Sequence, residues 1–497
     1  MMDNNHLEQL NLDQLNLEQK QKEAVGFNFI LNKLTPDSPY GVEKVKKIKP
    51  FTRNDQRLLD DHFDNIEKII IFSENNEKEL SKIRHQLMQL KNISGILTKC
   101  EQEALHEIEL FEVKHFLLTF EKLYHLFLQS VAQLKLNHIH LQPMTHILDI
   151  LDPEKKRLMS FALDGSFSMS LGKIQTQKLI IEAKIIVNST DELMYERKQL
   201  VLKELEENAK VMEELSLKLR AFIPVFLKNM DYLGELDLLI AKAIWAMEGH
   251  GTRPIISQSD TVVLKNMFNP MVVETLKKKS QIITKTSITL TKGTTIITGA
   301  NMGGKSISMK TMVLNVMLCQ MGFYVFAEHA KIPIFDHIVF ISGDMQDDNQ
   351  GLSTFGADIF HLNQLVQRLK NEFAFVALDE FAKGTNPEEG ASIVRGVASY
   401  LFESGSVCVM STHYDGVIMS SFKHYQVVGL DLEKLKEIEG HANAFKKQIS
   451  QYMDYRLIKV DGCQLPPRDA LHICQLMGLN EELLQRIKDG YKNQPFG

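Results

Sequence analysis

A glycine-rich segment between a β-branched run and a helix-forming stretch constrains the fold of this chain most strongly. Residues 294–311 read TTIITGANMGGKSISMKT, and Gly299, Gly304, Lys305 and Ser306 fit the phosphate-loop pattern G-x-x-x-x-G-K-[ST]. Glycines let consecutive backbone N–H groups converge on phosphate oxygens, and a helix starting near Lys305 directs its positive end at the same oxygens. We expect Lys305 to reach the β and γ phosphates of a nucleotide and the Ser306 hydroxyl to bind Mg²⁺.

The carboxylates that would complete such a site follow a second apolar run. FAFVALDE, residues 373–380, ends in Asp379 and Glu380, as expected for a fully buried central strand. The end of this strand is predicted to lie beside the phosphate loop, in the crevice where open α/β sheets bind ligands. Asp379 would then hold Mg²⁺ directly or through water, and Glu380 would polarise the attacking water.

Two further polar segments are candidates for the same site. VCVMSTHYD, residues 407–415, places His413 at the end of another expected strand, where a histidine can sense a γ-phosphate, although lone histidines are also commonly structural. Residues 343–355 read GDMQDDNQGLSTF, an acidic segment that ends in Ser353, Thr354 and Phe355. Core packing does not explain this composition, so we expect a functional role for the segment.

The pattern of apolar residues predicts two structural classes along the 497 residues. Arg53–Leu134 has helical spacing and almost no Gly or Pro, and Lys173–Lys218 predicts a pair of long, charged, exposed helices. From residue 255 to about 430, short apolar or β-branched runs alternate with helical segments, which is typical of an α/β domain with a mostly parallel sheet. The expected strands are Gln281–Thr284, Thr294–Thr298, Ile338–Ile341, Phe373–Leu378, Ser406–Met410 and Gln426–Leu430.

Composition and charge restrict the binding partners and the cellular compartment that we expect for this protein. The net charge of −6 gives no global basic footprint for nucleic acid, although a local patch such as Lys277–Lys279 is compatible with DNA binding. The five cysteines have no metal-binding spacing, which favours reduced thiols in a cytosolic protein. Residues 1–24 lack a signal-peptide core, and the longest apolar stretch, Met312–Ala327, is too short to span a bilayer. We therefore expect a cytoplasmic protein without a membrane partner.

Together these motifs resemble the MutS family of ABC-type ATPases. The resemblance rests on TGANMGGKS, YVFAEHAKIPIFDHI, GLSTF, LDEFAKGTNPEEG and STHY, which occur in this order. It implies that Ser306 and Asp379 bind Mg²⁺, that Glu380 is the catalytic base and that His413 is the sensor. It also implies that ATP phosphates are bound by Gly299, Ala300, Asn301, Met302, Gly303, Gly304, Lys305 and Ser306. Ser353 would face the nucleotide of a second subunit, so that a complete site requires a dimer of this chain with itself or with a related subunit.

The resemblance implies a multidomain fold in which an all-α core and lever bundle precedes an α/β P-loop ATPase domain with short C-terminal helices. The expected parts are a disordered or frayed lead-in at 1–24, the helical core and lever at 25–250, the ATPase domain at 251–430 and a helical dimerisation element at 431–497. The sequence departs from the family pattern at Ala300, where proline is usual, and at Ala382 and Lys383, where Gly-Arg is usual. The aromatic residue that stacks on adenine is not identified.

The mismatch-reading, DNA-clamp and nuclease-type modules of other family members are not recognised in the sequence, which leaves three functional readings open. The first is an ATPase that remodels a partner protein, as in the relatives that reactivate adenosylcobalamin-dependent aminomutases. The second is a paralogue that processes branched, mismatched or duplex DNA in repair or recombination. The third is a scaffold that binds ATP without turnover, against which Glu380 argues because such a protein needs no base. A salt-sensitive stimulation by DNA would distinguish the second reading.

Overall fold

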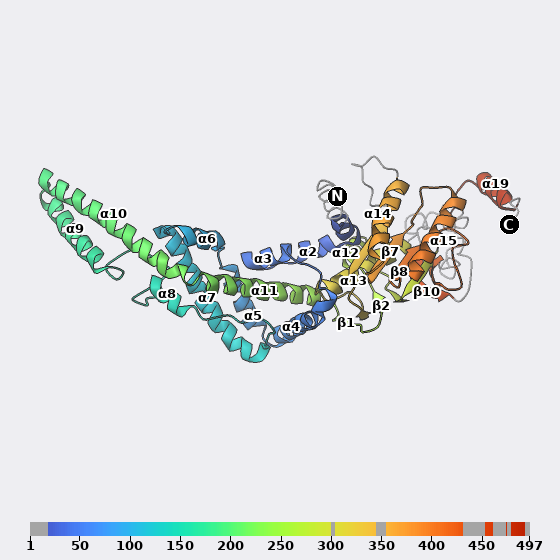
Figure 1. Ribbon diagram of the computed structural model, residues 1–497, viewed down its shortest axis with the longest axis horizontal. Helices are drawn as coiled ribbons and strands as arrows, with labels where there is room; N and C mark the ends of the chain where they lie inside the picture. Colours follow the sequence, from blue (N-terminus) through green and yellow to red (C-terminus); the bar gives the residue numbers. More distant parts are fainter. Residues whose placement is uncertain are drawn as a thin grey trace. The chain divides into compact units, whose positions relative to one another are not determined.

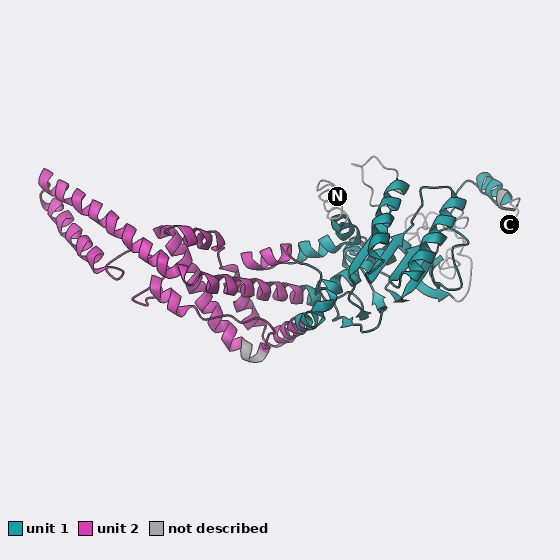
Figure 2. Ribbon diagram, viewed as in Figure 1, with its two compact units in different colours: residues 1–34, 49–63, 245–497 teal, residues 35–48, 64–244 magenta. Residues whose placement is uncertain are grey.

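The computed structural model describes residues 18–299, 304–343, 354–430, 453–460, 474 and 479–492. It divides the chain into two compact units, shown in different colours in Figure 2. Unit 2 contains Thr35–Ile48 and Asp64–Ile244, and unit 1 contains the remainder. Unit 1 therefore includes residues 25–34, Lys49–Phe63 and 245–250, which were expected to belong to the helical core.

Unit 2 is built from helices, as the apolar spacing predicts. Its core includes Phe116, Phe120 and Phe226, whose side chains are fully buried. The ring centroid of Phe116 lies within 6.2 Å of the centroids of Phe120 and of Phe226. The helices that lie in it wholly or in part are α3 (Pro39–Lys46), α4 (Gln56–Asn75), α5 (Glu77–Met88), α6 (Ser94–Gln102), α7 (Glu107–Leu134), α8 (Thr145–Leu151), α9 (Met169–Val187), α10 (Asp191–Arg220) and α11 (Ile223–Glu248). The chain passes between the two units after Leu34, after Ile48, within α4 and within α11.

The two long charged helices expected from Lys173–Lys218 are α9 and α10, which form an antiparallel pair (Figure 1). Thr190 begins α10 by accepting a hydrogen bond from the Leu193 N–H, which satisfies one of the free donors of the first turn. Ion pairs connect the helices, with Lys178 bound to Glu204 and Arg197 Nε 2.9 Å from Glu182 Oε1. Only residues 188–190 separate α9 from α10.

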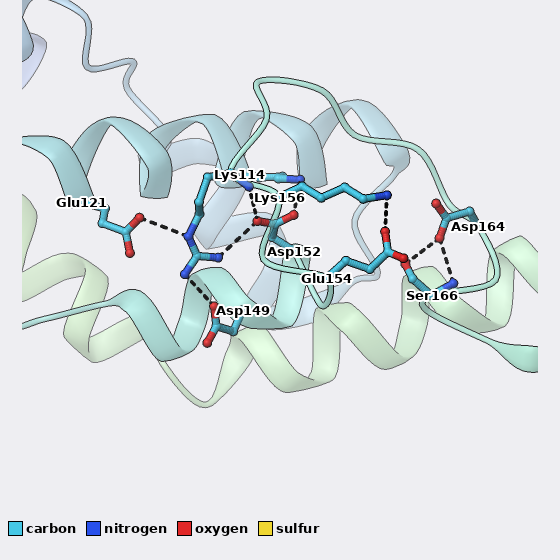
Figure 3. A network of polar contacts seen from close by, with 9 residues as sticks. Lys114, Glu121, Asp149, Asp152, Glu154, Lys156, Asp164 and Ser166 are labelled. Atoms are coloured by element: carbon cyan, nitrogen blue, oxygen red, sulfur yellow. Dashed lines mark hydrogen bonds and ion pairs between the residues drawn. The ribbon is translucent and has the colours of Figure 1, made fainter.

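A polar network fixes the segment after α8 (Figure 3). The buried Lys114 of α7 lies 3.2 Å from Oδ1 of Asp152, which is also buried. Arg157 binds the other carboxylate oxygen of Asp152 at 3.1 Å and Asp149 Oδ1 at 2.7 Å. Burial raises the pKa of Asp152, but the hydrogen bonds from Arg157 and Lys114 outweigh burial and hold this pKa below its usual value.

Unit 1 is organised around a six-stranded sheet in the order β10-β9-β4-β8-β7-β6. All neighbours are parallel except β10, which runs antiparallel to β9. The central strands are buried along their full length, which agrees with their continuous apolar sequences. The strands are β4 (Gly293–Thr298), β6 (His337–Ser342), β7 (Ala374–Asp379), β8 (Val407–Ser411), β9 (Lys423–Leu430) and β10 (Met453–Val460). The helices between them are α13 (Lys305–Gln320), α14 (Thr354–Arg368) and α15 (Pro387–Glu403) (Figure 1).

A second, four-stranded sheet in the order β1-β5-β2-β3 was not expected from the sequence. Its strands are β1 (Ile255–Ile256), β2 (Thr261–Met267), β3 (Thr286–Thr291) and β5 (His329–Ile332). The strand expected at Gln281–Thr284 is wrong, because these residues are not paired in a sheet and Ile282 is 95% exposed. They connect α12 (Pro270–Lys277) to β3, so their β-branched composition reflects neither pairing nor burial.

The described residues near both ends of the chain include helices, and one stretch expected to be helical is a strand instead. Residues 18–24 of the lead-in are helical, with the Gln21 side chain buried, and α2 (Phe27–Lys33) follows. In the C-terminal segment expected to be helical, Met453–Val460 is strand β10, because it completes the edge of the sheet beside β9. The second helical pattern of that segment is present as α19 (Glu481–Lys492). None of the helices in the described ranges combines the length and apolar character of a transmembrane span.

Candidate functional site

The described parts of the phosphate-loop segment have the backbone that the glycine pattern predicts. β4 ends at Thr298, Gly299 has a φ of 143°, and α13 begins at Lys305 directly after Gly304, which has a φ of 85°. Side chains are strained at such positive φ values, and a Cβ on Gly304 would also lie 2.7 Å from the Tyr455 ring. The other four predicted phosphate-binding residues, Ala300, Asn301, Met302 and Gly303, lie outside the described residues.

Lys305 is the buried cation of the site. Its Nζ donates a 2.8 Å hydrogen bond to the Gly299 carbonyl and lies 3.7 Å from Oε1 of Glu380. Burial lowers the pKa of Lys305, while the negative charges of Glu380 and Asp379 act in the opposite direction. An ammonium group at the first turn of a helix, beside glycine-flanked backbone, is a good binding group for phosphate oxygens.

Asp379 and Ser306 form the oxygen-rich part of the site. Asp379 is the last residue of β7 and is 3% exposed. The Ser411 hydroxyl at the end of β8 donates a 2.5 Å hydrogen bond to Asp379 Oδ1. Burial raises the pKa of Asp379, whereas hydrogen bonds from Ser411 and Ser306 lower it. The Ser306 hydroxyl is thus close enough to Asp379 to lower its pKa, as expected if both residues bind one Mg²⁺ ion.

Glu380 follows Asp379 in a left-handed backbone conformation, with a φ of 49°. Its Oε2 accepts a 2.6 Å hydrogen bond from Lys383 Nζ, and its Oε1 faces Lys305. Burial raises the pKa of Glu380, but the hydrogen bond from Lys383 and the charges of Lys305, Lys383 and His413 outweigh burial and lower it. The carboxylate is therefore stabilised in its ionised form, which is the form in which a general base acts.

His413 lies two residues beyond the end of β8 and its side chain is exposed. Desolvation of its buried part and the charges of Lys305 and Lys383 lower its pKa, whereas the Glu380 carboxylate raises it. His413 is thus electrostatically coupled to the group around Lys305 and Glu380. Ser353, the residue expected to face a second subunit, lies outside the described residues.

The donor set fits magnesium held jointly by protein and nucleotide. A hydroxyl and a single carboxylate are oxygen ligands of the kind Mg²⁺ uses when phosphate oxygens and water complete its shell. In the described parts of the chain, no group of three or more His, Cys, Asp or Glu side chains could hold a metal ion by itself. The residues present therefore fit MgATP better than an independent metal centre.

A cavity of about 510 Å³ opens beside the phosphate-loop segment. Its walls include Gly304 and Ser308 at the start of α13, Tyr455 of β10 and Phe268. The volume lies in the range typical of small-molecule sites, and the lining combines aromatic and aliphatic groups with a few polar ones. Tyr455 reaches this cavity only because Met453–Val460 forms the unexpected strand β10. For this reason no residue that could stack on a nucleotide base was identified from the sequence.

Two residues that position the carboxylates were missed by the sequence analysis. Ser411 was part of the quoted STHY motif, yet only His413 was given a role; the register of β7 and β8 pairs Ser411 with Asp379. Lys383 was noted only as a departure from a family pattern. A positive charge three residues after Glu380 could have suggested an ion pair between Lys383 and Glu380. The pair forms, however, only because the turn between the two residues brings their side chains together.

Comparison with known proteins identifies relatives of this region. Residues 295–465 match the family model described as MutS domain V. A protein named Endonuclease MutS2 from Caldicellulosiruptor bescii is 34% identical over 241 residues, which cover 48% of this chain and 29% of that protein. The Endonuclease MutS2 of Ligilactobacillus salivarius is 31% identical over 316 residues, or 61% of this chain and 38% of that protein. This chain thus matches well under half the length of these relatives.

The family match begins in β4 and includes Lys305, Ser306, Asp379, Glu380 and His413. Residues 295–465 are therefore similar to MutS domain V, and the chain is similar to MutS2 proteins over the aligned stretches.

Proposed function

We propose that this chain is a MutS-type ATPase that binds and hydrolyses MgATP and couples the reaction to DNA. The observation that carries the proposal is the convergence of Lys305, Ser306, Asp379 and Glu380 at one edge of the parallel sheet. ATPase activity in general is supported by the match to MutS domain V. The DNA substrate rests on the relatives, whose printed name is Endonuclease MutS2.

Each residue has a distinct role in the proposed reaction. Lys305 binds the β and γ phosphates, and Ser306 with Asp379 holds Mg²⁺, which supplies charge neutralisation at the phosphates. Glu380 orients and deprotonates the attacking water, for which its ionised state is suited. His413 responds to the γ phosphate, since it is already coupled electrostatically to Glu380 and Lys305. The cavity beside Gly304 accommodates the base, with Tyr455 as an aromatic wall.

The active form in this proposal is a dimer of the chain with itself or with a related subunit. Ser353 of one subunit would contact the nucleotide held by Lys305 of the other, so that ATP binding closes the dimer and hydrolysis opens it. This arrangement follows from the family resemblance.

We prefer DNA to a partner enzyme as the molecule on which the proposed ATPase cycle acts. The relatives are named endonucleases, an activity on nucleic acid, whereas no comparison supports reactivation of a cobalamin-dependent aminomutase. With a net charge of −6, DNA binding would have to use a local basic surface. The aminomutase reading is kept as an explicit outcome of the test below.

The test is the steady-state ATPase rate of the purified full chain, measured alone, with branched DNA, with mismatched duplex and with perfect duplex. Each is measured at about 50 and 200 mM salt, because phosphate contacts weaken steeply over this range. We expect Mg²⁺-dependent turnover that DNA stimulates, with less stimulation at the higher salt. Lys305→Ala serves as the inactive control, which excludes a contaminating ATPase.

Two results would change the assignment. Mg²⁺-dependent turnover that is indifferent to every DNA but rises with an inactivated cobalamin-dependent aminomutase would replace DNA by a protein partner. Absence of turnover together with tight ATP binding would indicate a nucleotide-dependent scaffold and would remove the base role of Glu380.

A further inference from the structure

The backbone that carries Glu380 is held in an unusual conformation. Glu380 and Ala382 have φ values of 49° and 62°, which side-chain-bearing residues rarely adopt. Such residues persist only where surrounding contacts determine the conformation. The direction of the Glu380 carboxylate depends on this turn, because Glu380 is its first residue.

Two hydrogen bonds and one further polar contact hold the turn. The Glu380 N–H donates to Ser411 Oγ at 3.0 Å. The Ala382 carbonyl accepts a 2.8 Å hydrogen bond from Tyr414 Oη, and the Ala382 amide lies close enough to the Asp358 carboxylate to lower its pKa. Ser411 and Tyr414 come from the β8 end of the site, whereas Asp358 comes from α14.

Asp358 is an acidic residue in a buried position. It is 6% exposed, and among the described residues no Lys, Arg or His forms an ion pair with its carboxylate. Burial raises its pKa to about 6, with the nearby Ala382 amide acting against the shift. A buried carboxylate without a cation is costly, so a role in fold stability alone would favour an apolar residue.

The packing of α14 against the turn also involves apolar residues on the same helix. Phe355 and Ile359 of α14 pack against the buried cluster that contains Phe381 and Ala382. A Cβ added to Gly384 would lie 3.6 Å from Phe355 Cβ. One side of α14 thus follows the turn from residue 381 to residue 384, and Asp358 is its polar attachment.

We infer that Asp358 is a positioning residue for the base: its carboxylate holds the Ala382 amide and thereby directs Glu380 toward Lys305. The inference rests on the proposed ATPase function and adds a regulatory connection to it. α14 begins at Thr354, the residue after Ser353, so a displacement of α14 on dimer closure would move the base. Asp358 does not touch the nucleotide and is not a catalytic residue.

The experiment compares the wild type with Asp358→Ala, Asp358→Asn and the exposed α14 control Asn363→Ala. Measurements are kcat and KM for ATP and the dissociation constant of ATP in the absence of turnover. We expect Asp358→Ala to lower kcat at least tenfold with ATP affinity within twofold of the wild type. Asp358→Asn keeps an acceptor oxygen and should recover most of kcat, and Asn363→Ala should match the wild type.

A double variant, compared with Asp358→Ala, tests the backbone strain of the turn directly. Glycine adopts positive φ without a steric cost, so Ala382→Gly should allow the turn to form without Asp358. We expect Asp358→Ala combined with Ala382→Gly to turn over at least threefold faster than Asp358→Ala. If Asp358→Ala does not fold, Asp358→Leu, which retains the volume but has no acceptor, replaces it in both comparisons.

The outcomes separate this inference from the proposed function. Wild-type protein without ATPase activity contradicts the proposed function itself. Active wild type with an unchanged kcat in Asp358→Ala overturns only the positioning role. The positioning role would also be overturned if Asp358→Ala and Asp358→Asn lost kcat and ATP affinity to the same extent as each other and Ala382→Gly restored neither. Such losses would indicate general damage to the fold.

Discussion

Ser411 and Asp379 are register partners at the ends of two neighbouring parallel strands, and the Ser411 hydroxyl donates a 2.5 Å hydrogen bond to Asp379 Oδ1. The same hydroxyl accepts the Glu380 N–H at 3.0 Å. One side chain therefore orients the proposed Mg²⁺ ligand and the first residue of the turn that carries the proposed base. This relationship requires strands β7 and β8 to be adjacent, which the chain order alone does not specify.

The first prediction concerns this hydroxyl. Ser411→Ala should raise the Mg²⁺ concentration for half-maximal ATPase activity by about 10-fold to 100-fold, the usual effect of losing a partner that orients a metal ligand. Ser411→Thr keeps the hydroxyl and should retain most of the Mg²⁺ affinity. The measurement is ATPase rate against free Mg²⁺ at saturating ATP. An unchanged Mg²⁺ requirement in Ser411→Ala would show that Asp379 is oriented without Ser411.

Lys305→Ala should abolish detectable ATP binding. The Lys305 ammonium is buried beside the Gly299 carbonyl, so its removal eliminates the cation available to the β and γ phosphates. The measurement is titration with a fluorescent ATP analogue. Lys91→Ala is a matched control, because Lys91 is exposed, pairs with Glu112 and belongs to unit 2, which does not contain the phosphate-loop segment. ATP affinity close to that of the wild type in Lys305→Ala would contradict the assignment.

Glu380→Gln should keep ATP binding and lose turnover by a factor of about 10² or more, the usual contribution of a general base. Because ATP is bound but not consumed, the variant should accumulate the closed dimer. Size-exclusion chromatography with multi-angle light scattering, with and without MgATP, measures this. Wild-type turnover in Glu380→Gln would remove the base role from this residue.

The phosphate-loop segment and its neighbouring strands could be predicted because their signals are local. Gly299, Gly304 and Lys305 occupy fixed spacings, and the run ending at Asp379 is apolar throughout because both faces of β7 are covered. The helices of unit 2 were predictable for the same reason. Their apolar residues recur every three or four positions, and few Gly or Pro residues interrupt them.

The features that were missed depend on contacts between distant segments. The segment that forms β10 was expected to be helical from the family resemblance, and a bulge between Asp454 and Leu457 interrupts its strand alternation. The strands of the smaller sheet are likewise defined by pairing between residues about 20 to 70 positions apart. Asp358 gave no signal in sequence, because its relation to Ala382 exists only after α14 packs against the turn.

The pH dependence of turnover should report the ion pair between Lys383 and Glu380. In the wild type, Lys383 and Lys305 lower the pKa of Glu380 against the effect of burial. Lys383→Ala removes one of these charges, so the Glu380 pKa rises and the base becomes protonated at a higher pH. The acid limb of kcat should therefore move to higher pH, whereas Lys383→Arg should leave it near its wild-type position. An unmoved acid limb in Lys383→Ala would mean that another group controls it.

The buried pair in unit 2 should dominate the acid stability of that unit. Asp152→Ala leaves Lys114 and Arg157 without their shared carboxylate, and loss of one partner of a buried pair costs about 3–5 kcal/mol. Lys114→Met should cost less, because Arg157 still pairs with Asp152. Urea unfolding followed by far-ultraviolet circular dichroism measures both, and Lys91→Ala at the exposed pair with Glu112 should cost below about 1 kcal/mol.

The sign of the pH effect follows from the lowered pKa of Asp152. A carboxyl whose folded pKa lies below its unfolded value of about 3.9 stabilises the fold above that pH, and this stability is lost as the pH falls through the folded pKa. Wild-type unit 2 should therefore lose stability below about pH 4, and Asp152→Ala should lose less over the same interval. If both proteins have parallel stability profiles from pH 6 to pH 2, the Asp152 carboxylate does not contribute through its ionisation. In that case the cost of Asp152→Ala arises from packing alone.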